Sequence, residues 1–528
     1  MPMPRLKMPA PLAPLAHPVF RMLWSTWLIA NVCMWMNDVA AAWMMSSMTE
    51  APFWVALVQT ASTLPVFLLG LPSGAMADIF DRRRYFIVTQ FWVAGVALCQ
   101  CLLMLAGFMN PPLLLALTFA NGIGLAMRWP VFAAIVPELV PRAHLPAALG
   151  LNGIAMNASR IAGPLIAGAI IASLGTAYVF VLNAMLSVAA GFMIMGWRRE
   201  HVPSPLERER FGSAMRVGIQ FVRQSARVKA VIARVAVFFF HSTALLALLP
   251  LIARKMNGGG AATFTLLLAC MGCGAITAVM FLPRLRQAMS RDSVVRYGAL
   301  LHAAMVVTVA LSSNLYLTMA AMVCSGMAWI STANSLSVSV QLALPDWVRA
   351  RGMSIYQMAL MGASAAGAAM WGKVAALDSV QHSLLLAACS GAMAMLAVLR
   401  LVTDHGLVED LTPSHAFKAP VSDRAPPRGR IVVRIEFHID PAHAGAFVAL
   451  MQESRRSRLR QGALGWELLQ DLSDPGRYVE QIVDPSWTEH LRRFDRVTEG
   501  DVALRERKLA FHLGDGAPVV TRQVIVAQ

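Results

Sequence analysis

Five polar side chains lie inside long apolar stretches, where they could bind a charged solute or carry a proton: Asp38, Arg128, Asn157, Arg160 and His241. Because a charge is costly in hydrocarbon, such residues usually face a partner, a cavity or an ion path. Two interpretations stay open for Asp38: it binds substrate or a proton, or it forms a structural ion pair with one of the two arginines. For His241, packing as an aromatic-like side chain is favoured over a proton role.

The first charged loop, which begins at Gly74, could act as a gate. It contains Asp78, Arg82 and Arg83, at the ends of two apolar stretches. A carboxylate at a helix end can interact with the positive N-terminus of another helix, and the arginines can pair with Glu138. The alternative is that the arginines only orient the loop toward the cytoplasm. That alternative does not explain Gly74 or Asp78, so a gate is favoured.

These residues must be positioned by helices that cross a membrane. Apolar stretches of about 20 residues, long enough to span the hydrocarbon core, alternate with short loops from Phe20 to Leu401. Only helices satisfy their own backbone hydrogen bonds in lipid. We expect about twelve spans, centred near residues 35, 63, 96, 124, 160, 186, 242, 271, 304, 327, 364 and 391. Every second loop is rich in arginine, which predicts that both termini are cytoplasmic.

The composition also indicates a membrane protein. Hydrophobic residues make up 57% of the chain and charged residues 14%, against roughly 45–50% and 25% in soluble domains. The net charge of +16 is spread over the loops and the C-terminal part, which argues against a nucleic-acid partner. All seven cysteines lie in apolar stretches and are interpreted as packing residues. We therefore expect no metal, cofactor, catalytic residue or disulfide.

The chain divides into six predicted segments. A string of Pro, acid, Val and Arg occurs at the same place in each half of the apolar region, beginning at Pro137 and at Pro345. This match favours an internal duplication. The segments are 1–19 (cytoplasmic N-terminal segment), 20–196 (first six-helix bundle), 197–230 (cytoplasmic central loop), 231–402 (second six-helix bundle), 403–429 (linker) and 430–528 (C-terminal domain).

The C-terminal domain has the pattern of a small α+β fold. Residues 431–439 alternate between apolar and polar types, as in a half-buried strand. Asp440 and Pro441 form a helix start, with an N-cap and a proline at the first helical position. Two strand-like segments, a second helix and a last strand follow. The order β-α-β-β-α-β predicts a ferredoxin-like domain.

The gate-like loop resembles the signature loop between the second and third helices of the major facilitator superfamily, Gly-x-x-x-Asp-Arg-x-Gly-Arg-Arg/Lys. Four positions match this pattern: Gly74, Asp78, Arg82 and Arg83. Ile79 and Asp81 stand where that family usually has arginine and glycine.

A string in the fifth span resembles the superfamily's antiporter motif, Gly-x-x-x-Gly-Pro-x-x-Gly-Gly. Gly163, Pro164 and Gly168 match it, whereas Ser159 and Ala167 are other small residues in place of glycine. Small residues allow close helix contacts, and a proline kinks the helix. In this superfamily the motif accompanies exporters more than importers. The arginine of the proton-relay motif is missing from the fourth span, so proton coupling is implied by analogy.

As a whole, the chain resembles bacterial exporters of the transmembrane secretion effector type, which are related to enterobactin and macrolide efflux proteins. The resemblance rests on Asn157, Arg160, Gly163, Pro164, the string at Pro137 and residues 248–254. Many members have an extra domain similar to the antibiotic-biosynthesis monooxygenase fold. Residues 460–463, Trp466 and residues 480–492 resemble that domain here.

The resemblance implies an all-α polytopic membrane protein of two six-helix bundles with a small cytoplasmic α+β ferredoxin-like domain. It implies export of a siderophore- or drug-like molecule across the bacterial cytoplasmic (inner) membrane by proton antiport. The expected partners are this small molecule, protons and the lipid bilayer, with dimerisation through the C-terminal domain as a further hypothesis. The alternative is that this domain is a cofactor-independent monooxygenase or a small-molecule sensor; without a visible catalytic constellation, sensing or dimerisation is favoured.

The arginines suggest what the substrate looks like. If Arg128 and Arg160 both face the central cavity, Asp38 can neutralise at most one of them. The remaining cation would favour a substrate with an anionic or electron-rich group, such as a carboxylate or a catechol.

Overall fold

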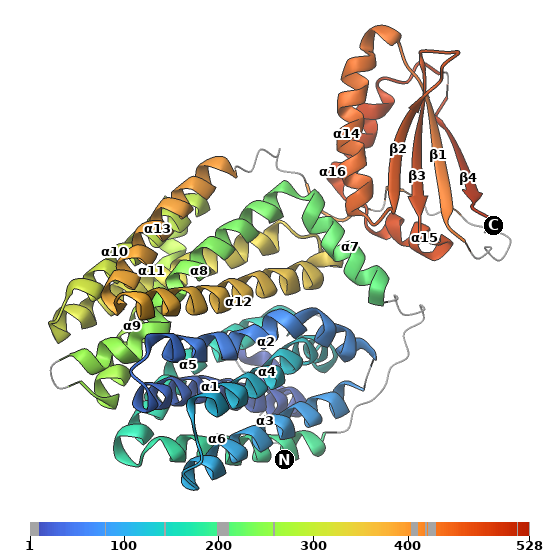
Figure 1. The fold of residues 1–528 in the computed structure, drawn as a ribbon. Coiled ribbons are helices and arrows are strands. Elements are labelled where there is room, and N and C mark those ends of the chain that lie inside the picture. The colour runs from blue at the N-terminus through green and yellow to red at the C-terminus, as the bar shows by residue number, and fades with distance from the viewer. Residues whose placement is uncertain are drawn as a thin grey trace. The chain divides into compact units, whose positions relative to one another are not determined.

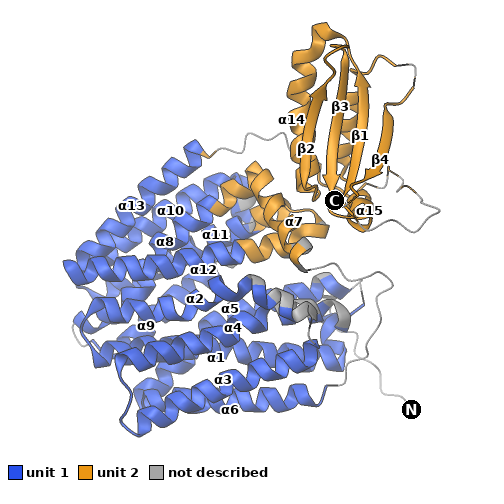
Figure 2. Cartoon of the chain, turned by 45° about the vertical axis from the view of Figure 1, so that its right-hand side comes forward, with its two compact units in different colours: residues 1–204, 233–337, 356–401 blue, residues 205–232, 338–355, 402–528 orange. Residues whose placement is uncertain are grey.

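The computed structural model describes residues 10–79, 81–141, 144–197, 211–256, 259–402, 410–414, 416, 417, 420, 429–514 and 516–526. The chain forms two compact units, which Figure 2 shows in different colours. Residues 1–204, 233–337 and 356–401 form the first, here called the helical unit. Residues 205–232, 338–355 and 402–528 form the second, here called the sheet unit.

Long helices make up the helical unit (Figure 1). After the 3-10 helix η1 (Ala10–Ala16), the first half contains α1 (Pro18–Met48), α2 (Pro52–Ile79), α3 (Arg82–Leu105), α4 (Pro111–Leu139), α5 (Leu145–Ser173) and α6 (Thr176–Met195). The second half contains α8 (Ala226–Lys255), α9 (Ala261–Ala288), α10 (Arg291–Leu311), α11 (Leu315–Leu342), α12 (Asp346–Leu377) and α13 (Val380–Leu401). The start of α8, the end of α11 and the start of α12 belong to the sheet unit.

The predicted spans are confirmed by these helices. Each predicted centre lies within one of them, and, among the described residues, 11 helices are long and apolar enough to cross a membrane. The helix outside that set is α12, with 32 residues. Its middle, residues 362–372, consists largely of Ala, Gly and Ser. These small side chains lower its hydropathy and allow neighbouring helices to approach closely.

The ends of several helices follow from local sequence. Asp81 caps α3, because its side chain accepts a hydrogen bond from the backbone N–H of Arg84 at 2.8 Å. Asn110 caps α4 in the same way, and a proline follows it at the first helical position. Gly107 follows the C-cap of α3, Ala106, and its φ of 74° lies in the left-handed region that favours glycine.

Contacts between α2 and α12 and between α5 and α9 join the halves of the helical unit. Between α2 and α12, the Thr60 hydroxyl donates to the Ala365 carbonyl at 2.9 Å. Between α5 and α9, Gly168 lies against the Thr265 side chain so closely that a Cβ at this position would overlap it. If α1–α6 repeat as α8–α13, then α2 corresponds to α9 and α5 to α12. The two connections are then equivalent, as an internal duplication predicts.

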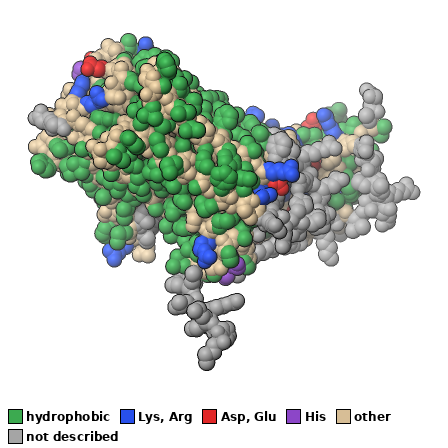
Figure 3. Space-filling model, turned by 90° about the horizontal axis from the view of Figure 1, so that it is seen from below, with side chains coloured by type: hydrophobic (Ala, Val, Ile, Leu, Met, Phe, Trp, Pro, Cys, Tyr) green, Lys and Arg blue, Asp and Glu red, His purple; other side chains and the backbone are tan. Residues whose placement is uncertain are grey.

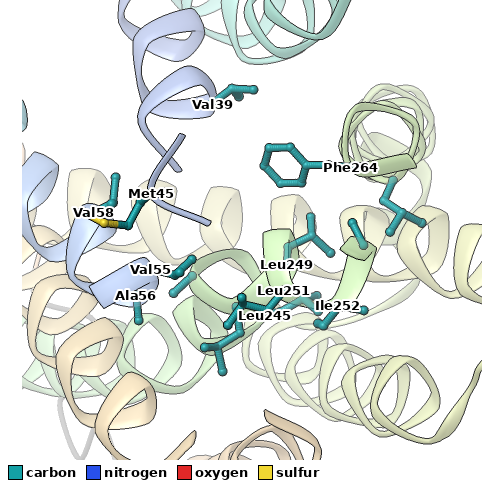
Figure 4. Packing of buried hydrophobic residues seen from close by; sticks show 14 of the residues in the cluster. Val39, Met45, Val55, Ala56, Val58, Leu245, Leu249, Leu251, Ile252 and Phe264 are labelled. Carbon is teal, nitrogen blue, oxygen red and sulfur yellow. The ribbon is translucent and has the colours of Figure 1, made fainter. Parts of the chain in front are cut away.

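The helical unit is apolar both inside and outside. Its largest buried cluster draws on helices of both halves; in Figure 4, Met45 and Val55 come from α1 and α2, and Leu249 and Phe264 from α8 and α9. Large hydrophobic side chains are also exposed, such as Phe108 at 71%. In Figure 3, hydrophobic side chains cover most of the described surface of this unit. A surface of this kind belongs in lipid.

The sheet unit has the predicted ferredoxin-like order. Its elements are β1 (Ile431–His438), η3 (Pro441–His443), α14 (Ala444–Arg460), β2 (Gly465–Gln470), β3 (Arg477–Asp484), α15 (Trp487–Asp495), α16 (Glu499–Leu509) and β4 (Val519–Val524). All neighbouring strands are antiparallel, in the order β2-β3-β1-β4, with Val433 opposite Ile482. The sequence had not predicted α16. Nor had it predicted α7 (Phe211–Gln224), which lies within the segment expected to be a central loop.

Helix α7 packs against α14 in the sheet unit, and three consecutive carbonyl groups hold this region together. The Gly462 carbonyl accepts a hydrogen bond from Arg216 at 3.1 Å, and the Ala463 carbonyl accepts one from Gln220 at 2.8 Å. The Gln461 carbonyl accepts one from Arg496 at 2.7 Å. The turn after α14 therefore fixes both α7 and α15.

Candidate functional site

The guanidinium group of Arg160 lies between two tryptophan rings. Its Cζ is 5.3 Å from the ring centroid of Trp35 in α1 and 4.8 Å from that of Trp329 in α11. Both distances are in the range of cation–π attraction, within about 6 Å. Among the described residues this guanidinium has no ion pair or hydrogen bond, and its Nε is buried without a partner. A guanidinium packed against aromatic faces in this way has N–H groups that can donate to an anionic group.

Arg160 contacts residues from both halves of the helical unit. Arg160 is on α5 and Trp35 on α1, both in the first half, whereas Trp329 is on α11 in the second. In a transporter built from two repeats, substrate sites lie at the interface of the repeats. The contacts thus place the Arg160 guanidinium where such a site is expected.

Gly163 brings α1 close enough to α5 for this arrangement. A Cβ at Gly163 would overlap the Cβ of Trp35. Arg160 and Gly163 are three residues apart on one helix, so their side chains lie on neighbouring positions of one face. The glycine thus allows Trp35 to pack directly beside Arg160. Ser159, the first motif position, is buried and donates to the Ala155 carbonyl at 2.6 Å.

Asp38 lies three residues after Trp35 on α1. Within the described part of the chain, no hydrogen bond or ion pair reaches its carboxyl group. The structural ion pair with Arg128 or Arg160, one of the two interpretations from the sequence, is therefore not formed in this structure. A carboxyl without an ion-pair partner can take up or release a proton without breaking such a pair.

Arg128 has a different environment from Arg160. It is 3% exposed and donates to the Gln90 amide oxygen at 3.2 Å and to the Ala30 carbonyl at 3.3 Å. Its Cζ lies 5.6 Å from the ring centroid of Trp27. All three partners belong to the first half of the helical unit. The hypothesis that both arginines face one central cavity is thus not supported, because Arg128 is enclosed by its own bundle.

The gate-like loop is described only in part. Arg83 donates a hydrogen bond to the Met195 carbonyl at the end of α6. Asp81, where the family pattern has glycine, is the N-cap of α3. The side chains of three other predicted positions lie outside the described residues: Asp78, Glu138 and Asn157. Of Gly74 only its place in the backbone of α2 is described. The gate therefore stays a prediction.

Two histidines lie inside the second half. His241 hydrogen-bonds the Val237 carbonyl at 2.8 Å, and its ring lies 5.7 Å from that of Trp371. Sequence reasoning missed His302, which is 4% exposed and hydrogen-bonds the Ser325 hydroxyl at 3.0 Å. His302 lies in the middle of the span centred near residue 304, where an ionisable side chain is unusual, and this position could have identified it as a candidate. No group of three or more His, Cys, Asp or Glu among the described residues could hold a metal ion.

In the sheet unit, β3 directs two carboxylates inward. Glu480 and Asp484 are fully buried and lie four residues apart, on the same face of the strand. Glu480 lies 3.2 Å from the Lys508 ammonium and 3.6 Å from the Arg458 guanidinium. It also accepts hydrogen bonds from Trp466 and Ser454. Asp484 pairs with Arg493 and with His490, each at 2.8 Å. Buried carboxylates of this kind persist only because cations and donors surround them.

Acid should weaken the sheet unit through Glu480. Burial alone would raise the pKa of this carboxyl. Lys508, Arg458 and the two hydrogen bonds lower it by more than burial raises it, so that the pKa is about 2. Because this pKa lies below the ordinary value of 4.5, the stabilisation is complete above pH 4.5 and is lost as the pH falls toward 2. The difference corresponds to about 3 kcal/mol. We expect faster deuterium exchange of residues 477–484 in the full chain at pH 3 than at pH 6, after correction for intrinsic rates.

Glu480→Gln should show fast exchange in this strand at both pH values, because it leaves a buried cation without its partner. Glu467→Gln, an exposed change on β2, is the matched control and should behave as wild type. Equal protection of wild type at both pH values would contradict the assignment.

Comparisons with known proteins agree with this architecture. A family model described as "Transmembrane secretion effector" matches residues 9–528. The staphyloferrin A transporter of Staphylococcus aureus is 22% identical over 252 residues, which are 47% of this chain and 63% of that protein. The MFS-type transporter YfiS of Bacillus subtilis is 25% identical over 201 residues, 37% of this chain and 47% of that protein. The chain thus spans about half to two thirds of the length of these relatives.

Solved structures show the same fold. The nucleoside transporter NupG has a TM-score of 0.58 at 12% identity, covering 72% of this chain and 98% of that one. The human organic anion transporter MFSD10 has a TM-score of 0.53 at 14% identity, covering 73% and 99%. At these identities the likeness concerns the fold alone. With the family model matching nearly the whole sequence, the chain belongs to the transmembrane secretion effector family of the major facilitator superfamily.

Proposed function

We propose that this multi-pass transporter exports a small organic anion, siderophore- or drug-like, across the bacterial cytoplasmic membrane in exchange for protons. The observation that supports the anion is the Arg160 guanidinium, which two tryptophans hold and which no carboxylate neutralises among the described residues. An anionic substrate would supply the missing counter-charge. The flat tryptophan faces beside it suit an aromatic or otherwise planar body.

Asp38 is the proposed proton carrier. It lies on α1 three residues from Trp35, and α1 contacts the Arg160 site directly. Proton binding at Asp38 and anion binding at Arg160 would both change the net charge of this part of the membrane interior. Exchange requires that proton binding at Asp38 and anion binding at Arg160 alternate, so that each passage across the membrane carries one or the other.

The family relationship supports export of a small metabolite. One relative is named for transporting staphyloferrin A, and the motif around Gly163 accompanies exporters in the superfamily. We further propose that both termini are cytoplasmic, since every second loop is rich in arginine. In this orientation, the loop from Gly74 to Arg83, with Glu138, would close the cytoplasmic face.

Arg160→Gln should reduce export of an anionic substrate without preventing folding. Losing one charge-assisted hydrogen bond of about 1.5–3 kcal/mol corresponds to about a ten- to hundredfold loss. The measurement is efflux of two fluorescent compounds from cells, one with a carboxylate and one with an amine on the same ring system. Arg160→Lys keeps the charge but not the planar group, so it should retain part of the carboxylate export.

Arg254→Gln is the matched control. Arg254 also lies over a tryptophan, with its Cζ 4.9 Å from the Trp43 centroid, but it hydrogen-bonds Ser46. This variant should export both compounds as wild type does. Efflux of the amine alone, unaffected by Arg160→Gln, would refute an anionic substrate.

The second candidate function concerns the sheet unit, as a monooxygenase or a sensor. Trp466 and His490, which lie in the segments that resemble the monooxygenase-like domain, make structural contacts: Trp466 donates to Glu480, and His490 pairs with Asp484. These contacts favour a binding role of the sheet unit over catalysis.

A further inference from the structure

The sheet unit contains a cavity of about 430 Å³. It lies between the inward face of the sheet and helices α14, α15 and α16. The strands supply an apolar wall that includes Val433, Ile435 and Ile482, and Phe437 lies at its side. The volume is in the range of small-molecule sites, about 300–1,000 Å³. All of the lining residues belong to the C-terminal part of the chain, 416–522.

Cations line the other walls of this cavity. They are Arg458, Arg493, Arg505, Lys508 and Arg522. Three of these cations face a carboxylate: Lys508 and Arg458 face Glu480, and Arg493 faces Asp484. Asp501, the carboxylate that lines the cavity, accepts hydrogen bonds from Thr498 and Ser457.

Two of these cations have no carboxylate within 4.0 Å among the described residues. Arg505 lies over the ring of Phe417, with its Cζ 4.9 Å from the centroid. Arg522 donates to His490 Nε2 at 3.3 Å, while His490 Nδ1 faces Asp484. Arg522 thus contacts a histidine nitrogen and not a carboxylate. The cavity therefore has a surplus of positive charge that an anion would offset.

Buried polar atoms on the same walls also lack partners. Arg493 Nε and the Gln461 side-chain oxygen are buried and have no hydrogen-bond partner among the described residues. Both residues line the cavity, and they are 7% and 3% exposed. An unpaired buried donor or acceptor costs about 1–3 kcal/mol. A ligand with both an acceptor and a donor could satisfy the two atoms.

We infer that this cavity is a regulatory binding site for a small hydroxylated aromatic acid or a similar planar anion. Its apolar body would lie on Val433, Ile435 and Phe437, and its anionic group would face the surplus cations. A hydroxyl group would donate to Gln461. This inference is independent of the transport site at Arg160, because every residue that supports it lies in the sheet unit.

Gln461 connects the cavity to the rest of the sheet unit. Its side chain faces the cavity, while its carbonyl accepts from Arg496, which lies over the Trp347 ring at 5.2 Å. The next two carbonyls hold α7 through Arg216 and Gln220. Trp347 belongs to the first turn of α12. A ligand that moves Gln461 would thus change the contacts of α7 and of the start of a membrane helix.

The test uses 3-hydroxy-2-naphthoate as probe and purified full-length protein carrying Arg160→Gln, so that the transport site contributes no anion binding through its arginine. Val520→Trp should fill the cavity, because Val520 lines it from β4 and is 42% exposed. We expect this variant to weaken probe binding by at least about tenfold. Val519→Trp is the matched control, since Val519 is 61% exposed and is not part of the lining. It should bind as the parent does.

Two further measurements keep the inference testable if Val520→Trp disturbs the strand. Arg522→Gln should reduce the preference for the naphthoate over 2-(aminomethyl)naphthalene by about tenfold. The probe should also change deuterium exchange of residues 211–224 in the parent, but not in Val520→Trp. Equal probe affinity in the parent, Val520→Trp and Arg522→Gln, or no binding by the parent at millimolar probe, would overturn the site. Binding without any change in residues 211–224 would overturn its regulatory role.

Discussion

Asp38→Asn is expected to abolish proton-driven export while exchange of substrate across the membrane continues. The carboxyl of Asp38 has no partner among the described residues, so changing its protonation does not break an ion pair. Asparagine has nearly the same shape but cannot carry a proton. One pH unit corresponds to 1.36 kcal/mol per proton and can sustain about a tenfold substrate gradient. The variant should lose this gradient completely.

The measurement needs protein reconstituted in liposomes. Uphill transport is driven by an imposed pH gradient, and exchange is measured with labelled substrate on one side and unlabelled substrate on the other. Asp378→Asn is the control: Asp378 follows the end of α12, is 59% exposed and pairs with His382. It should retain both activities. A normal gradient in Asp38→Asn would show that the proton travels by another group, and loss of exchange as well would point to substrate binding.

The sequence was sufficient for the helices but not for the side chains that meet between them. Arg160 was identified as a candidate because a charge inside a span is unusual. Its partners, Trp35 and Trp329, come from helices far apart in the sequence. A hydrophobic period indicates that a span is helical, yet a helix that is apolar all round does not reveal which face meets which neighbour. The same limit explains Arg128, whose enclosure within one bundle depends on Gln90 in α3.

Prediction of the sheet unit succeeded for its strands and failed for α16. Alternation of apolar and polar residues identified β1 because a sheet covered on one face has this period. Helix α16 has few apolar residues and little amphipathic character, so periodicity alone did not show it. Its signal was local: the carboxylate of Asp501 accepts from the backbone N–H of Thr498, as in a capping box. The buried carboxylates Glu480 and Asp484 interrupt the apolar pattern of β3. They are stabilised there by cations from other elements, which the pattern of the strand does not reveal.

Gly163→Ala is expected to abolish most transport, although alanine is the better helix former. At an open position of a helix this change stabilises the protein by about 0.5–1 kcal/mol. At Gly163 the added Cβ would overlap the Cβ of Trp35 and come within 3.1 Å of the Val32 carbonyl oxygen. Because one of these atoms is backbone, α1 must move as a whole, which costs about 1–3 kcal/mol. The movement carries Trp35 away from Arg160.

Gly153→Ala on the same helix is the control, since nothing lies within 4 Å of its Cβ position. It should raise the melting temperature slightly and leave export unchanged, whereas Gly163→Ala should lower both. Export at the level of Gly153→Ala would contradict the close contact of α1 and α5. Normal stability with lost export in Gly163→Ala would assign the defect to the Trp35–Arg160 contact and not to general packing. A combined Gly163→Ala, Arg160→Gln variant should then export the carboxylate compound no worse than Arg160→Gln alone, because both changes remove the same interaction.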